Sequence, residues 1–162
     1  MNANHLNIIW NITRICPWDC TACCVDAMHV KAVGDSIVVR HSSLARTVLL
    51  NREVACSPYD VAYGYAVKHG MEISTGTKLQ VLENIASYEG SVAIDFSGGD
   101  PLVVNDNIGI MKHAASVLGR ENIGISSTGI GLRRYDVGLL ANIVSRVDFT
   151  YDSSSYWTRP SP

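Results

Sequence analysis

The chain has 162 residues, of which 47% are hydrophobic and 17% are charged, so it carries enough apolar side chain for one globular domain with a hydrophobic core. Thirteen lysines and arginines stand against fifteen aspartates and glutamates, which gives a formal net charge of −2. This balance excludes the basic surface that general binding to a nucleic acid backbone requires.

The N-terminal residues contain no basic stretch followed by a long apolar run, so no secretory signal peptide is predicted. No apolar segment reaches the length that crosses a membrane. We therefore expect a cytoplasmic protein with no membrane partner. In that reducing compartment its five cysteines indicate metal ligands or reactive thiols in preference to disulfides.

Four short segments have the β-branched and aromatic composition of buried strands, and each is followed by turn residues. Apolar residues at helical spacing predict helices between the later strands. The predicted strands cover residues 6–13, 92–97, 123–128 and 147–151, and the predicted helices cover 77–88, 106–118 and about 136–145. Strands that alternate with helices in this way indicate an α/β fold with a parallel sheet.

Details of these helices can also be predicted. Thr75 or Thr77 is expected to cap the first helix, since a hydroxyl can accept a hydrogen bond from a backbone N–H of the first turn. Ile110, Ala114 and Val117 are expected to form the apolar face of the second. The third should begin at Tyr135 or Asp136.

Residues 25–74 interrupt the alternation, and we interpret them as an insertion within a single domain. Residues 36–40 have the composition of a short strand. A helix is expected to begin at Pro58 and to end at Gly70, because proline is favoured in the first turn of a helix and glycine just after its end.

Three cysteines follow the first predicted strand at the spacing C-x3-C-x2-C, namely Cys16, Cys20 and Cys23. Iron–sulfur clusters are usually held by four thiolates, so a set of three leaves one iron open to another ligand. The alternatives are a zinc site and packed cysteines, but a zinc site favours four ligands. The adjacent Cys24 could hardly face the same metal as Cys23, so we interpret Cys24 as a packing residue and leave Cys56 unassigned.

A glycine-rich segment, Gly98-Gly99-Asp100-Pro101, follows the second regular strand. The carboxyl ends of parallel strands are where α/β sheets bind ligands, and two glycines allow backbone groups to come close to one. An acidic side chain there can accept hydrogen bonds from an ammonium group. The same four residues would also make an ordinary turn.

Together the cysteine spacing and the Gly-Gly-Asp-Pro segment resemble the radical S-adenosylmethionine (radical SAM) superfamily. The resemblance implies a (β/α) barrel in which Cys16, Cys20 and Cys23 hold a [4Fe–4S] cluster. It also implies that S-adenosylmethionine chelates the open iron and, after reductive cleavage, yields a radical that removes hydrogen from a substrate. The Gly-Gly-Asp-Pro segment is similar to the family's Gly-Gly-Glu, which receives the amino group of S-adenosylmethionine, so Asp100 is the expected side-chain contact.

Further cosubstrate contacts are implied at the later strand ends. Ser126 and Thr128 follow the third regular strand and are expected to share one face by strand alternation, with Ser127 on the other. Asp152 follows the fourth. Each could instead satisfy turn backbone groups. The chain departs from the family pattern at Ala22, where an aromatic residue is usual, and in lacking the Asn of a Thr-Asn-Gly turn.

The family barrel has six βα units, whereas about four are predicted here, so we expect a partial barrel. The resemblance also implies a reductase, flavodoxin or ferredoxin as electron donor and an unidentified substrate, with a peptide or protein as the nearest class. Two alternatives remain, a noncatalytic iron–sulfur or electron-transfer module and a zinc-stabilised module. The five histidines lack metal-ligand spacing, and surface or packing roles are expected for them.

Overall fold

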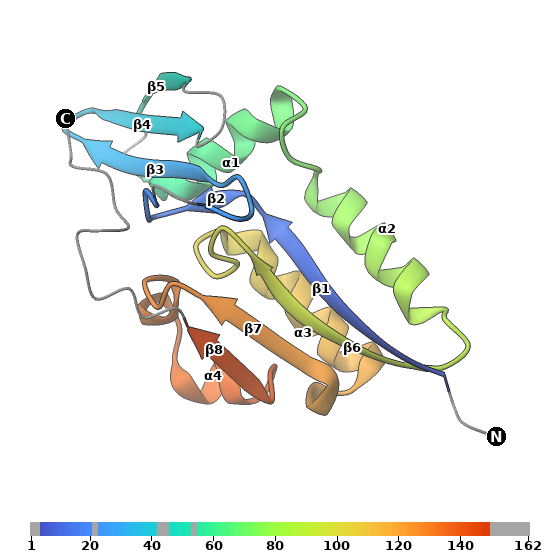
Figure 1. The fold of residues 1–162 in the computed structure, drawn as a ribbon. Coiled ribbons are helices and arrows are strands. Elements are labelled where there is room, and N and C mark those ends of the chain that lie inside the picture. Colours follow the sequence, from blue (N-terminus) through green and yellow to red (C-terminus); the bar gives the residue numbers. More distant parts are fainter. Residues whose placement is uncertain (1–3, 21–22, 42–45, 53–54, 150–162) are drawn as a thin grey trace.

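A computed structural model describes residues 4–20, 23–41, 46–52 and 55–149. Four parallel strands form its main sheet in the order β1-β6-β7-β8 (Figure 1). They are β1 (His5–Thr13), β6 (Ser91–Gly98), β7 (Ile123–Ser127) and β8 (Arg146–Phe149). The α/β class and the four predicted strands are therefore confirmed, with boundaries shifted by a few residues.

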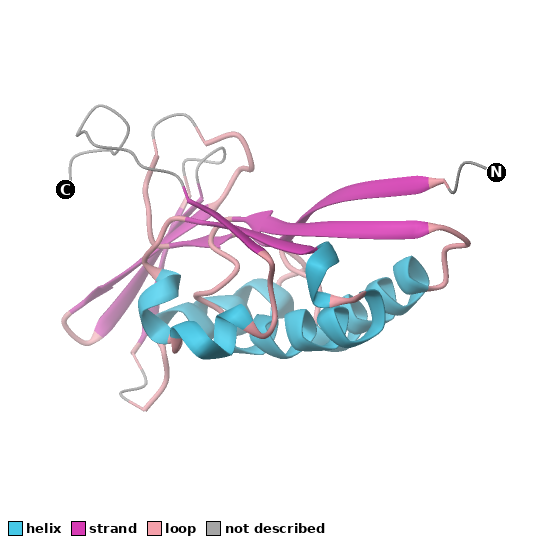
Figure 2. Cartoon of the chain, turned by 90° about the horizontal axis from the view of Figure 1, so that it is seen from below, coloured by secondary structure: helices cyan, strands magenta, loops and turns pink. Residues whose placement is uncertain are grey.

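Helices cover one face of the main sheet, and no helix of the described residues lies on the opposite face (Figure 2). The covering helices are α2 (Thr75–Ala86), α3 (Asn105–Leu118) and α4 (Val137–Ala141), with short 3-10 helices at Arg120–Asn122 and Gly131–Arg134. Leu82, Phe96 and Ile110, one from each of three elements, are almost fully buried in the core between sheet and helices. Removal of such apolar surface from water is the main driving force for this packing.

The main sheet is open in the described part of the chain. β1 pairs only with β6, and β8 pairs only with β7, so the two strands at the ends of the order do not meet. This arrangement is compatible with a partial β/α fold, but a closed barrel is not formed by the residues described.

Three details of the predicted helices were wrong. Ser74, not Thr75 or Thr77, caps α2, and its hydroxyl accepts a hydrogen bond from the Thr77 N–H. In α3 the buried face includes Met111, and Val117 is 43% exposed because it lies at the border of that face. Helix α4 ends at Ala141, and a turn with buried Ile143 and Val144 then leads into β8.

Residues 14–68 build a second sheet beyond the carboxyl end of β1 (Figure 1). Its order is β2-β3-β4-β5, from β2 (Ile15–Cys16), β3 (Met28–Val33), β4 (Ser36–His41) and β5 (Thr47–Asn51). Helix α1 (Pro58–Lys68) packs on it through Ala62, Tyr63 and Ala66. The predicted strand at 36–40 and the helix from Pro58 are confirmed. The sequence analysis missed β3, the hairpin partner of β4. Gly34, with φ +56°, lies in the turn between these two strands.

No helix in the described part of the chain is long and apolar enough to cross a membrane.

Substitutions in α3 test this assignment of the core. Ile110→Ala should lower the free energy of unfolding by about 2–5 kcal/mol, because it leaves a cavity in the buried core. Val117→Ala should change it by no more than about 0.5 kcal/mol, because the side chain is largely in solvent. Urea titration monitored by circular dichroism measures both, and equal losses would contradict the observed rotation of the helix.

Candidate functional site

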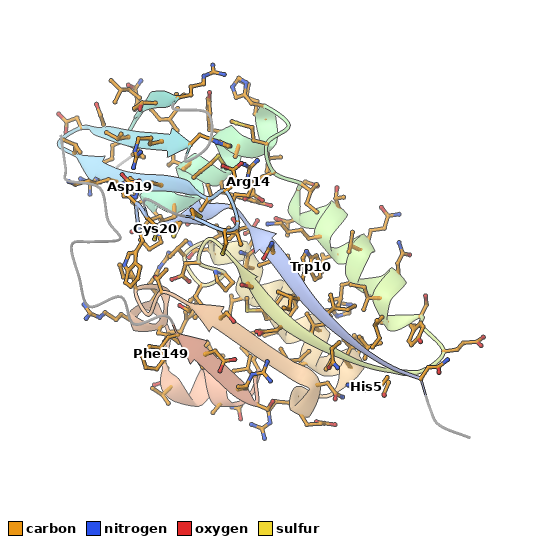
Figure 3. All side chains as sticks on the ribbon, in the orientation of Figure 1. His5, Trp10, Arg14, Asp19, Cys20 and Phe149 are labelled. Atoms are coloured by element: carbon orange, nitrogen blue, oxygen red, sulfur yellow. The ribbon has the colours of Figure 1, made fainter. Side chains whose placement is uncertain are left out.

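The predicted metal ligands lie at the carboxyl end of the main sheet. Figure 3 shows Asp19 and Cys20 at the end of the molecule toward which β1 points, with His5 at the opposite end. Cys16 is buried at the end of β2, while Cys20 and Cys23 lie in the following segment and are partly exposed. We call residues 13–23, from the end of β1 to Cys23, the cysteine loop.

The sulfur atoms of two of these cysteines accept backbone hydrogen bonds. The Trp18 N–H donates to Cys16 Sγ at 3.4 Å, and the Ala27 N–H donates to Cys23 Sγ at 3.3 Å. Such N–H donors favour negatively charged sulfur and influence the potential of a bound iron–sulfur cluster.

The charge on Cys16 depends strongly on its surroundings. Burial raises the pKa of the Cys16 thiol to about 12, and the Trp18 hydrogen bond opposes this shift. The charges of Asp100, Cys20 and Cys23 raise the same pKa further. A bound cation would reverse this balance, because metal coordination deprotonates a thiol.

In the described residues, no group of three His, Cys, Asp or Glu side chains is arranged to hold a metal ion. The donor set nevertheless fits an iron–sulfur cluster in its chemistry. Three thiols belong to one loop, and two of them already accept N–H hydrogen bonds.

The second sheet anchors the cysteine loop by charge. Arg40 of β4 forms an ion pair with Asp19, and both side chains are less than one-fifth exposed. At the base of the loop, Arg14 pairs with the Asp26 carboxylate and donates to the Asp26 carbonyl oxygen at 3.0 Å and 3.1 Å.

His41 also lies beside the Arg14–Asp26 ion pair at the base of the cysteine loop. Burial, followed by the charge of Arg14, lowers the pKa of His41, so the ring is neutral near pH 7. Its Nε2 lies 2.7 Å from Arg14 Nη2 and accepts from it, while its Nδ1 lies 3.5 Å from Asp26 Oδ1. The role expected for the histidines, surface or packing, therefore does not describe His41.

The segment at residues 98–101, here called the glycine loop, lies directly against the start of the cysteine loop. The Gly99 N–H donates to the Thr13 carbonyl oxygen at 2.7 Å, and the Asp100 N–H donates to the Ile15 carbonyl oxygen at 2.8 Å. Gly98 has φ +121°, and a Cβ at Gly98 or Gly99 would overlap the carbonyl oxygens of Thr13 or Ile15. Only glycine allows this approach.

The Asp100 carboxylate is fully buried and accepts hydrogen bonds from the chain itself. Its donors are the hydroxyls of Ser127 and Thr128 and the backbone N–H groups of Leu102, Thr128 and Gly131. Asp100 thus joins the end of β6 to the end of β7, which keeps the two strand ends at a constant separation.

Ser126 and Thr128 do not share a face, contrary to the alternation expected. Thr128 lies beyond the end of β7 and turns toward Asp100, as Ser127 does. Ser126 instead donates to Asp95 Oδ2 at 3.2 Å, an oxygen that Arg146 also contacts at 3.2 Å. Asp95, Arg146 and neighbouring residues line a hollow of about 320 Å³.

The other predicted positions are less informative. The Pro101 carbonyl oxygen accepts from Asn107 Nδ2 at 3.0 Å, so this residue is tied to α3. Asp152 and Ala22 lie outside the described residues.

Sequence reasoning missed the residues that anchor the cysteine loop, namely Arg14, Asp26, Arg40 and His41. No motif marks them, because Arg40 and His41 are far from the loop in sequence and reach it only through the pairing of β3 with β4. Asp26 has a φ of +51°, which is unusual for a residue other than glycine. This angle is visible only in the structure, so it could not have marked the residue in the sequence.

The chain is similar to the GTP 3′,8-cyclase of Alkaliphilus metalliredigens (strain QYMF), with 24% identity over 90 residues. The match covers 56% of this chain and 28% of the relative, so the chain corresponds to about a quarter of that enzyme's length. GTP 3′,8-cyclase is a radical SAM enzyme, and the similarity supports the general radical SAM kind. No protein-family model and no solved structure matches the chain.

The contact between the two loops can be tested by adding a methyl group. Gly99→Ala should lower the free energy of unfolding by about 1–3 kcal/mol, because the new Cβ overlaps the Ile15 carbonyl oxygen. Gly109→Ala, in an open position on α3, should instead stabilise the protein by about 0.5–1 kcal/mol. Guanidinium titration measures both, and a neutral Gly99→Ala would show that the loops are not in contact.

Proposed function

We propose that this chain is the cluster-binding and cosubstrate-binding core of a radical SAM enzyme. The observation that carries the proposal is that the Gly-Gly-Asp-Pro loop lies against the residues that lead into the C-x3-C-x2-C motif, with backbone hydrogen bonds from Gly99 to Thr13 and from Asp100 to Ile15. The partial similarity to GTP 3′,8-cyclase supports the same kind of protein.

In this proposal Cys16, Cys20 and Cys23 hold a [4Fe–4S] cluster through three of its irons. When bound, the cluster would supply an electron that cleaves S-adenosylmethionine reductively, and the fourth iron would be open to that cosubstrate. The protein's part is to hold the three thiols in one loop, donate N–H groups to their sulfurs, and keep the base of the loop ordered through Arg14 and Asp26.

The glycine loop would bring S-adenosylmethionine against the cluster. Backbone groups of Gly98 and Gly99 are the proposed contacts, since the missing side chains allow close approach. Asp100 is proposed to supply the negative charge of the glycine loop. Its carboxylate is fully buried and accepts from five donors of the chain, so we propose that it acts on the ammonium group of the cosubstrate through its charge at a fixed position, and not through the direct side-chain contact expected from the sequence. Ser126 and Asp152 are proposed contacts at the later strand ends.

The proposed partners follow from the chemistry. Reductive cleavage needs an external electron, so we propose a flavodoxin, ferredoxin or reductase as donor. The substrate is proposed to be a molecule that loses a hydrogen atom, with a peptide or protein as the favoured class. The competing function is a noncatalytic iron–sulfur module, which would transfer electrons without binding S-adenosylmethionine.

Anaerobic reconstitution with iron and sulfide tests the cysteine assignment. The wild-type chain should take up about four irons per chain, as a cubane cluster requires. Cys20→Ala should lose the cluster, because two remaining thiolates cannot replace the third. Cys24→Ala is the matched control and should load normally. A Cys20→Ala chain that assembles the same cluster would remove the ligand assignment.

Addition of S-adenosylmethionine and dithionite separates the enzyme from the electron-transfer module. For the enzyme, the electron paramagnetic resonance spectrum of the reduced cluster should change on addition of S-adenosylmethionine, and 5′-deoxyadenosine should accumulate. For the electron-transfer module, the spectrum should be the same with and without it. That second result would contradict the enzymatic function for this chain.

A further inference from the structure

A lysine is completely buried beneath the two loops. Lys78 of α2 has no exposed surface, which is rare for this residue type unless its charge is compensated. Its Nζ donates to Asn107 Oδ1 at 3.2 Å, lies 3.9 Å from Glu72 Oε2, and sits 4.3 Å from the centre of the Tyr63 ring. The ammonium group therefore has three partners, each from a different segment.

One branch of this network reaches the glycine loop. The side-chain amide of Asn107 accepts from Lys78 through its oxygen and donates through its nitrogen to the Pro101 carbonyl oxygen at 3.0 Å. Asn107 is itself fully buried. The position of Pro101, the last residue of the glycine loop, is thus linked to the position of the lysine.

The other branch reaches the start of the cysteine loop. Glu72 Oε1 accepts from the Thr13 hydroxyl at 2.8 Å and from the Arg14 N–H, and the Glu72 side chain is only 4% exposed. The Thr13 hydroxyl also accepts from the Ile15 N–H at 3.1 Å. Glu72 therefore contacts the two residues that immediately precede β2 and Cys16.

We propose that Glu72, Lys78 and Asn107 are positioning residues that hold the glycine loop and the cysteine loop in one relative arrangement. That this arrangement serves S-adenosylmethionine rests on the function proposed above. The physical reason is that a buried charge tolerates little displacement from its partners, whereas an apolar side chain of similar size would slide. Stability alone does not require such a network, since a neutral pair can replace a buried ion pair without loss.

The protonation of Lys78 provides a check on its burial. Burial lowers the pKa of Lys78 from 10.5 to about 8, while Glu72 and Asp106 oppose this shift. Tyr63, the titratable group that faces it from α1, has a pKa that burial raises. Between pH 8 and 10.5 the unfolded chain binds more protons at this lysine than the folded chain does, so the free energy of unfolding should rise with pH relative to a Lys78→Met variant. A constant difference would contradict a pKa that burial lowers.

Hydrogen exchange tests the positioning role without requiring activity. In Lys78→Met and in Asn107→Leu, the Gly99 and Asp100 amides, which bond across to the other loop, should exchange about tenfold faster than in the wild type. The exchange rates of the Ile94 and Ile125 amides in the sheet should increase much less than those of Gly99 and Asp100. Val92→Ala, at the far end of β6, is the control for general destabilisation. It should leave the ratio of the exchange rates of the loop amides to those of the sheet amides unchanged.

The double variant Glu72→Gln with Lys78→Met guards against unfolding caused by one unpaired buried charge. It keeps an oxygen that can accept from Thr13 and Arg14 but lacks the link to Asn107. We expect it to fold with near wild-type stability and still to exchange faster at Gly99 and Asp100. Equal acceleration of all core amides, or no acceleration at the loops, would overturn the proposal.

Cleavage kinetics connect the network to the cosubstrate. In reconstituted Asn107→Leu, the S-adenosylmethionine concentration for half-maximal 5′-deoxyadenosine formation should rise about tenfold, while the maximal rate should change by less than about threefold. Faster loop exchange with an unchanged half-maximal concentration would show that the network does not serve cosubstrate binding. A wild-type chain that forms no 5′-deoxyadenosine would instead reject the proposed function, and hydrogen exchange would still decide whether the network joins the loops.

Discussion

Two backbone hydrogen bonds, from Gly99 to Thr13 and from Asp100 to Ile15, bring the two loops of the candidate site together. They require glycine at residues 98 and 99, because any side chain there would overlap the opposite carbonyl groups. They also place Asp100 where it is buried, near Cys16 and at the end of β7. The site therefore depends on one close backbone contact between parallel strand ends.

Charged side chains reinforce this contact from both sides. Above it, the second sheet holds the cysteine loop through the Arg40 ion pair with Asp19. Elsewhere, the buried Lys78 of α2 lies 3.9 Å from Glu72, whose carboxylate accepts from Thr13 and Arg14. Charged groups in such places are costly unless every one is paired, so a set of paired groups on both sides of a loop restricts its movement. This restriction would suit three thiols that share one cluster, as proposed.

The insertion at residues 25–74 has a clear structural role. It was expected only as an interruption of the βα alternation, but its strands form a sheet with β2, and Cys16 pairs there with His29. The cysteine loop is consequently held between two sheets, with the main sheet at its start and the second sheet along its side. Helix α1 and the core around Tyr63 then connect the second sheet to Lys78.

Local sequence determined the four main strands, the three long helices to within a few residues, the cysteine spacing and the glycine segment. The reason is that hydrophobic periodicity, proline, glycine and motif spacing are read within a few neighbouring residues. The tertiary structure alone decided which donors surround Asp100, that Thr128 turns away from Ser126, and that Arg40, His41, Glu72 and Lys78 support the loops. The open form of the main sheet was also decided there. These features depend on contacts between residues far apart in the chain, for which a single sequence carries no periodic signal.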